Sequence, residues 1–183
     1  MQNDVVCAGF GGQGVLLIGK VLAYAGMKAG KEVSWFPSYG PEMRGGTANC
    51  TVVISDRPIG SPVIQHPRSL IAMNLPSLDK FEPMLRPDAF LLINTSLVNR
   101  EPSRDDLKVL KIPASAIAIE EGNPRSANMV ALGAYIGGTG ILDPEVVEGI
   151  LEKEFERKPQ VLEVNLKAFR RGYELGVEAR NGD

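Results

Sequence analysis

Residues 5–20 read VVCAGFGGQGVLLIGK, and this stretch decides the fold. An apolar run enters a cluster of four glycines, and an apolar pattern with helical spacing follows at once. The glycine spacing G-x-G-x-x-G fits the turn between the first strand and the first helix of dinucleotide-binding folds. We therefore expect a Rossmann-like start, with a buried strand over residues 4–9 and a helix over residues 12–29.

Beyond this start, strand-like and helix-like patterns alternate along the chain. Strands are expected over residues 31–36, 47–55, 69–73, 89–93 and 108–112. Helices are expected over residues 76–85, 126–137, 143–154 and 159–178. This alternation predicts an α/β fold with three layers, α/β/α, around a mostly parallel sheet. The first two strands are expected to be parallel neighbours, whereas the third follows the second without a helix, so it can run antiparallel and make the sheet mixed.

The composition is that of an ordinary globular domain. The chain has 183 residues, of which 44% are hydrophobic and 23% charged, so we expect a single domain over 1–183 with its core over about 4–178. A formal net charge of -2 argues against electrostatic binding of nucleic acid. No apolar stretch approaches the roughly 20 residues needed to cross a bilayer, and no secretory signal is recognised, so we expect a cytoplasmic protein without membrane contact.

The cysteines and the histidine argue against several kinds of metal and catalytic site. Cys7 and Cys50 lie in predicted strands beside apolar or β-branched residues, which indicates small buried side chains. Two cysteines cannot hold an iron–sulfur cluster that needs four thiolates. His66 is the only histidine and lies in a proline-flanked loop, so the sequence supports neither a Ser-His-Asp triad nor a histidine-rich metal site. We therefore predict no catalytic residue and no metal ligand in this chain.

The end of the second predicted strand tests whether the glycine turn binds NAD. A dinucleotide site needs a carboxylate there to bind the ribose hydroxyls, but the strand over 31–36 ends in Trp35 and Phe36. Glu32 stands at the opposite end of that strand, and Glu42 lies beyond it in the following loop. NAD is therefore disfavoured, and two uses of the turn remain: close packing of the helix on the strand, or binding of another phosphate group.

Two further stretches carry a resemblance to a known family. SYGPEMRGGTANCTVVIS, residues 38–55, is a glycine-rich loop that runs into a strand. GNPRSANMVALGAYIG, residues 122–137, is a turn that runs into a helix of small residues. Together with GFGGQG, residues 9–14, these stretches resemble the gamma subunit of 2-oxoacid:ferredoxin oxidoreductases, and the resemblance runs from about residue 4 to about residue 175.

This resemblance implies a role within a larger enzyme. Enzymes of the family convert a 2-oxoacid and coenzyme A into acyl-CoA, CO2 and reduced ferredoxin, with thiamine diphosphate and iron–sulfur clusters as cofactors. The sequence holds no GDG…NN-type segment for thiamine diphosphate and Mg. The resemblance therefore implies that these groups and the 4Fe-4S clusters lie in alpha, beta and delta partner subunits, and that the chain is inactive alone. The first expected substrate is 2-oxoglutarate, ahead of pyruvate, branched-chain 2-oxoacids and indolepyruvate.

Coenzyme A is the co-substrate that the resemblance associates with this chain. Its phosphates suit the N–H groups of a helix N-terminus and the planar donors of an arginine. The candidate binding residues are Gly11, Gly12, Gln13, Gly14, Arg44 and Asn128. The loop over 38–46 and the start of the helix are expected to lie together at the carboxyl edge of the sheet, where ligands bind in α/β folds.

Other interpretations of the same residues stay open. Gly14 and Gly19 can simply let the helix pack closely on the strand, and Arg44 can form a salt bridge with another subunit, oriented by Glu42. At the level of the whole chain, one alternative is a stand-alone nucleotide-binding or regulatory module that uses the same turn. Another is an assembly subunit without any ligand contact.

Overall fold

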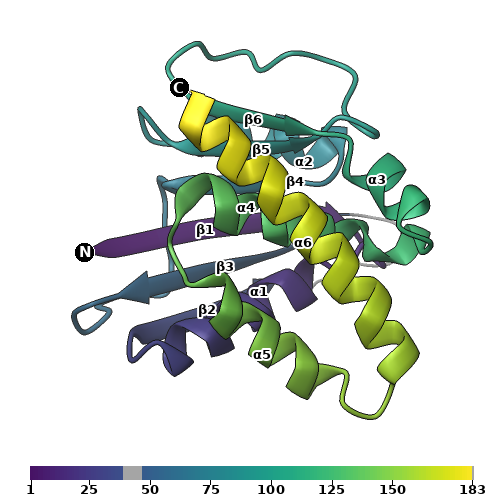
Figure 1. Ribbon diagram of the computed structural model, residues 1–183. Coiled ribbons are helices and arrows are strands. Elements are labelled where there is room, and N and C mark those ends of the chain that lie inside the picture. The colour runs from purple at the N-terminus through teal and green to yellow at the C-terminus, as the bar shows by residue number, and fades with distance from the viewer. Residues whose placement is uncertain (39–46, 183) are drawn as a thin grey trace.

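The computed structural model describes residues 1–38 and 47–182, which form a six-stranded sheet with helices on both faces (Figure 1). The strands are β1 (Gln2–Phe10), β2 (Glu32–Ser38), β3 (Thr47–Ser55), β4 (Ser69–Ala72), β5 (Phe90–Asn94) and β6 (Lys108–Ile112). The helices are α1 (Val15–Lys28), α2 (Leu75–Phe81), α3 (Ala114–Glu120), α4 (Ala127–Thr139), α5 (Pro144–Glu154) and α6 (Pro159–Gly182). Two short 3-10 turns accompany them, η2 (Glu82–Met84) and η3 (Pro124–Ser126).

The sheet is mixed, as the connection without a helix between the second and third strands predicted. Its strand order is β2-β3-β1-β4-β5-β6. β1, β4, β5 and β6 are parallel, whereas β3 runs antiparallel to both β1 and β2. The prediction that β1 and β2 are neighbours is wrong, because β3 lies between them. β3 is largely buried and pairs with β1 along its whole length, so it takes the inner place and the more exposed β2 is left at the edge.

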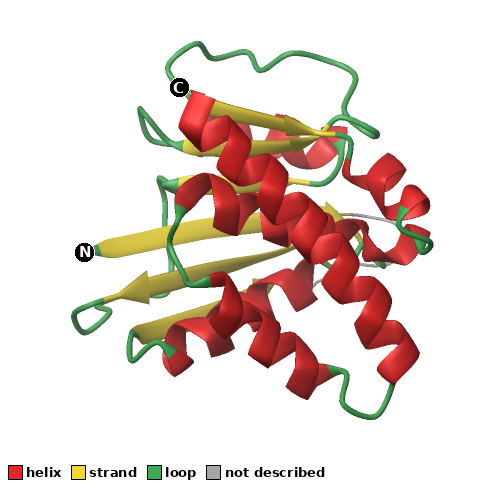
Figure 2. Ribbon diagram, viewed as in Figure 1, coloured by secondary structure: helices red, strands yellow, loops and turns green. Residues whose placement is uncertain are grey.

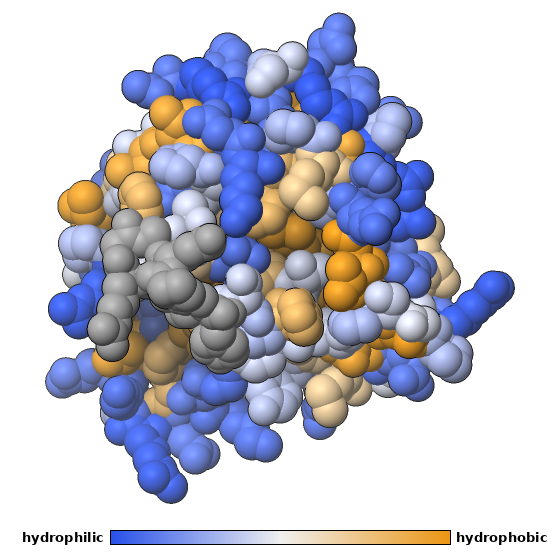
Figure 3. Space-filling view, turned by 180° about the vertical axis from the view of Figure 1, so that it is seen from behind, coloured by the Kyte–Doolittle hydropathy of each residue, from blue (hydrophilic) through white to orange (hydrophobic). Residues whose placement is uncertain are grey.

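Helices cover the two faces of the sheet unequally (Figure 2). α1, α3, α4, α5 and α6 build the larger core on one face, with Ile18, Leu22 and Phe169 among its buried side chains. α2 covers the other face, where Leu78 and Phe81 are buried. Apolar side chains show among hydrophilic ones when the molecule is seen from behind (Figure 3). The prediction of three layers, α/β/α, is therefore confirmed, with one thick and one thin helical layer.

Most predicted elements are present, and their ends differ from the prediction for local reasons. α1 begins at Val15 rather than at residue 12, because Gly14 has φ 73° and acts as its N-cap. The helix expected over 76–85 ends at Phe81 and continues as η2, which contains Pro83. α3 is absent from the prediction, since seven residues are too few to show a helical period.

Four glycines bring α4 and α6 into close contact. Gly133 and Gly137 lie on α4, and Gly172 and Gly176 lie on α6. A Cβ on Gly133 would stand 1.9 Å from the carbonyl oxygen of Phe169, and a Cβ on Gly172 would stand 2.0 Å from a carbonyl oxygen of α4. The two backbones therefore touch at this crossing, and any side chain at these positions would push the helices apart.

Cys7 and Cys50 are buried and form an in-register pair across β1 and β3, as predicted for small apolar side chains. A hydrogen bond between the two thiols raises the pKa of Cys7, and burial acts in the same direction. A Cβ on Gly19 of α1 would lie 2.3 Å from the Cys50 Sγ. The packing role predicted for Gly19 is thus confirmed, because the missing side chain lets α1 lie close to β3.

Candidate functional site

The glycine turn joins the carboxyl end of β1 to the start of α1. Gly12 has φ 93° and Gly14 has φ 73°, conformations that favour glycine. The N–H groups of Leu17 and Ile18 donate to the Gly14 carbonyl, each at 3.1 Å. Among the described residues, five preceding N–H groups have no acceptor, those of Gly11, Gly12, Gly14, Val15 and Leu16. Together with the positive end of the α1 dipole, these donors suit a phosphate or another anion.

A cavity of about 240 Å³ lies at this turn. It is lined by Phe10, Gly11, Gly12, Gly14, Val15, Leu16 and Ala48. The Phe10 side chain is 41% exposed and gives the cavity an apolar wall. No described atom lies within 4 Å of the position that a Cβ on Gly12 would take. The turn is therefore open to a ligand on the side of Gly12.

Asn128 reaches the glycine turn from the first turn of α4. Its Nδ2 donates to the Gly14 carbonyl at 3.3 Å, and its side chain is buried. A Cβ on Gly14 would stand 2.3 Å from that nitrogen. The structure thus brings together two of the candidate residues, Gly14 and Asn128, and the close packing predicted for Gly14 is made against α4.

Gln13 folds its side chain back onto the chain rather than away from it. Its Oε1 accepts from the Phe10 N–H at 2.6 Å and from the Asn74 Nδ2 at 3.2 Å. Its Nε2 donates to the Met73 carbonyl at 3.4 Å. A Cβ on Gly9 would stand 2.6 Å from the Gln13 Oε1, so glycine at that position leaves room for the side chain. Both ends of the Gln13 amide are thus bonded within the protein.

Two buried asparagines at this edge are missing from the sequence prediction. Asn74 follows β4 and caps α2, because its Oδ1 accepts from the Ser77 N–H at 2.9 Å. Asn94 ends β5, and its Nδ2 donates to the Met73 carbonyl at 3.2 Å and to the Ser115 Oγ at 3.1 Å. The signal that could have found them is an asparagine directly after an apolar strand, as in LIAMN and FLLIN.

Arg44, the remaining candidate residue, lies outside the described residues, as does most of the loop over 38–46. Thr47, which follows that loop, pairs with Phe10 at the end of β1. The chain therefore returns from the loop beside the glycine turn. That the loop itself lies against the helix start stays a prediction.

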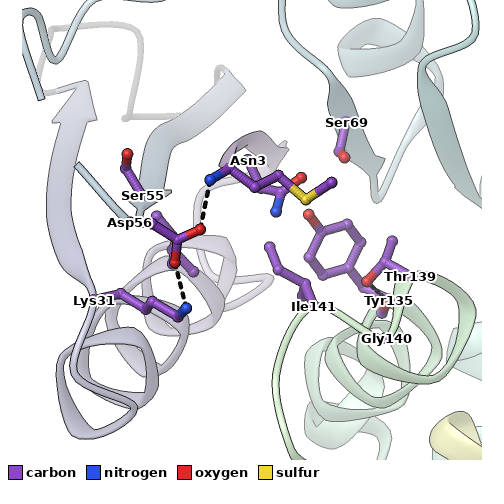
Figure 4. A pocket seen from close by; sticks show the side chains of 11 residues that line it. Asn3, Lys31, Ser55, Asp56, Ser69, Tyr135, Thr139, Gly140 and Ile141 are labelled. Carbon is purple, nitrogen blue, oxygen red and sulfur yellow. Dashed lines mark hydrogen bonds and ion pairs between the residues drawn. The ribbon is translucent and has the colours of Figure 1, made fainter.

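A second cavity, of about 360 Å³, lies at the opposite edge of the sheet (Figure 4). The ring of Tyr135 faces it, and burial raises the pKa of this phenol. Lys31 and the Met1 amino group both bind the Asp56 carboxylate. The hydrogen bond from Lys31 lowers the pKa of Asp56 to about 2, and the Met1 amino group acts in the same direction. Because these charged groups pair with one another, the carboxyl edge is the better candidate for a ligand site.

Metal ligands do not gather in the described part of the chain. Within residues 1–38 and 47–182, no three His, Cys, Asp or Glu side chains form a group that could hold a metal ion. In the same residues, every helix is too short or too polar to cross a membrane.

Comparisons with known proteins agree on one family. The family model for pyruvate ferredoxin/flavodoxin oxidoreductase matches residues 4–175. Ketoisovalerate oxidoreductase subunit VorA of Methanothermobacter marburgensis is 41% identical over 181 residues, which cover 98% of this chain. The chain spans only 37% of the length of that relative.

Two solved structures are similar in both fold and sequence. The gamma subunit of keto/oxoacid ferredoxin oxidoreductase from Geobacter sulfurreducens has a TM-score of 0.82 and 31% identity, and the match covers 96% of this chain and 99% of that one. The 2-oxoglutarate:ferredoxin oxidoreductase from Magnetococcus marinus was solved with 2-oxoglutarate, coenzyme A and succinyl-CoA bound. It has a TM-score of 0.89 and 27% identity, and the match covers 97% of this chain and 31% of that one. The mixed sheet described above is therefore the architecture of the gamma subunit.

Proposed function

This chain belongs to the pyruvate ferredoxin/flavodoxin oxidoreductase family, and from that premise we propose that it is the gamma subunit of a 2-oxoacid:ferredoxin oxidoreductase. The complex would convert a 2-oxoacid and coenzyme A into acyl-CoA, CO2 and reduced ferredoxin. The observation that carries the proposal is the match to the Geobacter sulfurreducens gamma subunit over 99% of that chain. The same likeness supports residues 1–183 as a single domain and favours a complex over a stand-alone nucleotide-binding module.

The redox and carbon chemistry of the complex belongs, in this proposal, to its other subunits. Thiamine diphosphate, Mg and the 4Fe-4S clusters would lie in the alpha, beta and delta subunits, with ferredoxin as the electron acceptor and the cytoplasm as the location. Two observations support this division of labour. Cys7 and Cys50 are both buried free thiols that are hydrogen-bonded to each other, and the described residues hold no cluster of metal ligands.

The contribution of this chain to the reaction is contact with coenzyme A at the carboxyl edge. The backbone N–H groups of Gly11, Gly12 and Gly14 would donate to a phosphate of coenzyme A, because they have no acceptor among the described residues. Arg44, in the loop over 38–46, would supply a charged donor. Gln13 and Asn128 complete the proposed site, and both hold the turn through side-chain amides.

Coexpression with the candidate partner subunits tests the proposed function. We expect a stable complex that reduces a viologen dye only when a 2-oxoacid and coenzyme A are both present, whereas the isolated chain shows no turnover. Running 2-oxoglutarate, pyruvate and ketoisovalerate in parallel identifies the acid, with 2-oxoglutarate expected first. A chain that copurifies with none of these subunits and binds nucleotides alone would favour the stand-alone module instead.

A further inference from the structure

Side-chain amides form a continuous hydrogen-bonded chain across the carboxyl edge of the sheet. It starts at the Phe10 N–H and passes through Gln13 to Asn74. Gln13 also shares the Met73 carbonyl with Asn94. Three successive strand ends, those of β1, β4 and β5, are therefore tied together directly behind the glycine turn.

The bonding capacity of Gln13 shows which role its side chain can take. An amide oxygen has two acceptor sites, and both are used, by the Phe10 N–H and the Asn74 Nδ2. One of the two N–H donors of the Gln13 side-chain amide is directed to the Met73 carbonyl. The Gln13 N–H of the backbone also donates to the Phe10 carbonyl at 3.1 Å. The turn from Phe10 to Gln13 is thus closed twice, once by its backbone and once by this side chain.

Asn74 does more than a helix cap requires. Capping α2 uses only an oxygen acceptor for the Ser77 N–H, which serine or aspartate provides equally well. The amide nitrogen of Asn74 is needed only for the bond to Gln13. Asn74 is buried, so a broken bond would leave a polar group without a partner away from water. The asparagine at this position is therefore specifically suited to hold Gln13.

We propose that Gln13 and Asn74 are positioning residues, which fix the backbone N–H groups of Gly11, Gly12 and Gly14 for a phosphate of coenzyme A. The inference rests on the proposed function of the glycine turn. Neither side chain needs to touch the ligand. Their effect is to keep the donors of a glycine-rich turn in one geometry before the ligand arrives, which avoids the cost of ordering them on binding.

Asn74→Ser tests the inference, because it keeps the α2 cap and removes only the donor to Gln13. In the assembled complex we expect the KM for coenzyme A to rise about tenfold, as for a lost hydrogen bond of 1.4 kcal/mol, with kcat nearly unchanged. Gln13→Met removes that bond together with the other two side-chain bonds of Gln13, to the Phe10 N–H and the Met73 carbonyl, so the KM should rise at least as much. In NMR spectra of the full chain, the N–H resonances of Gly11, Gly12 and Gly14 should shift or broaden in Asn74→Ser and Gln13→Met.

Asp143→Ser is the matched control, because it replaces the cap of α5 far from the turn. It should leave both the KM for coenzyme A and the glycine resonances as in the wild type. The inference is overturned if the wild-type complex uses coenzyme A but Asn74→Ser and Gln13→Met leave its KM unchanged. It is also overturned if both variants lower only kcat or the yield of complex. A wild-type complex without any dependence on coenzyme A would instead overturn the proposed function itself.

Discussion

Gly14 has a left-handed backbone conformation, and the side-chain amide of Asn128 from α4 occupies the space where a Cβ would lie. The Gly14 carbonyl accepts from the N–H groups of Leu17 and Ile18 and from the Asn128 Nδ2. One glycine therefore starts a helix, exposes neighbouring N–H groups and admits a partner from a distant helix. Comparing alanine at Gly14 with alanine at Gly12 separates the cost of backbone strain from the cost of losing the Asn128 contact.

Gly14→Ala is expected to lower the free energy of unfolding by about 2–3 kcal/mol. A left-handed φ costs roughly 1–2 kcal/mol for an L side chain, and displacing the Asn128 amide costs about 1 kcal/mol more. Urea unfolding of the full chain measures the change. Gly12→Ala is the matched control, because Gly12 shares a positive φ but has open space around it. If the two variants lose equal stability, the Asn128 contact does not matter.

Arg44→Ala is expected to change the assembled complex and not the isolated chain. We expect an arginine in a glycine-rich loop to bury little apolar area, so the stability of the chain should change by no more than about 0.5 kcal/mol. Loss of a charge-assisted bond to a phosphate or a partner carboxylate should cost about 1.5–3 kcal/mol in binding. Melting temperature, coenzyme A requirement and yield of complex are the measurements. A raised coenzyme A requirement identifies ligand contact, and a lost complex identifies subunit docking. Unfolding of the chain, or no effect on any property, would contradict both roles.

Among the elements, α4 and α6 depend most strongly on the absence of side chains. Their glycines face carbonyl oxygens of the opposite helix rather than flexible side-chain ends. A backbone carbonyl cannot move aside without moving its helix, so the crossing tolerates no added methyl group. Since α4 also carries Asn128, this crossing holds the residue that reaches the glycine turn.

Gly133→Ala is therefore expected to destabilise the fold by about 3 kcal/mol or more, the upper range for overpacking a core. Gly149→Ala is the matched control on α5, since no atom lies within 4 Å of the added Cβ. In that open helical position alanine should raise the stability by about 0.5–1 kcal/mol. Thermal or urea unfolding distinguishes the two, and a stabilising Gly133→Ala would show that the helices are not in contact at this point.

Elements with a long apolar period were predictable, and those fixed by tertiary contacts were not. The strands over 47–55 and 108–112 have the predicted bounds, because their sequences alternate or run apolar between turn residues. The place of β3 between β1 and β2 depends on which strands can be buried together, and local sequence carries no such information. Asn74 and Asn94 join one hydrogen-bonded network, through Gln13 and the Met73 carbonyl, only after β4 and β5 have been placed side by side. The glycine turn was predictable because its spacing is local, whereas its bond to Asn128 joins residues 114 positions apart.

At the scale of the whole molecule, the two edges of the sheet are stabilised by different forces. Hydrogen bonds of uncharged side-chain amides connect the strand ends at the carboxyl edge. At the other edge the Asp56 carboxylate, just after β3, binds Lys31 from before β2 and the amino group of Met1 (Figure 4). Acid should therefore weaken the second edge and leave the first unaffected.

Stability should fall as the pH drops through the titration of Asp56. Its pKa is lowered from 3.8 to about 2 in the folded chain, so the folded state favours the carboxylate, and this contribution is present above 3.8 and lost toward pH 2. Asp56→Asn should flatten the pH dependence of the melting temperature in this range. Burial raises the pKa of Asp4, which acts in the opposite sense and is unchanged by the variant. The exposed Asp105→Asn is the control, and an equal flattening there would rule out the role of Asp56.

The order of strands in the sheet also determines how the chain can fold during its synthesis. Residues 2–55 contain β1, β2 and β3, which form one contiguous part of the sheet with β3 in the middle, together with α1. Because this segment leaves the ribosome before residues 69–112, its three strands can pair while the rest is still being translated. The side of β1 that later receives β4 then remains an open strand edge. That edge can pair with other chains, as open strand edges do, and it is protected only when β4 has emerged.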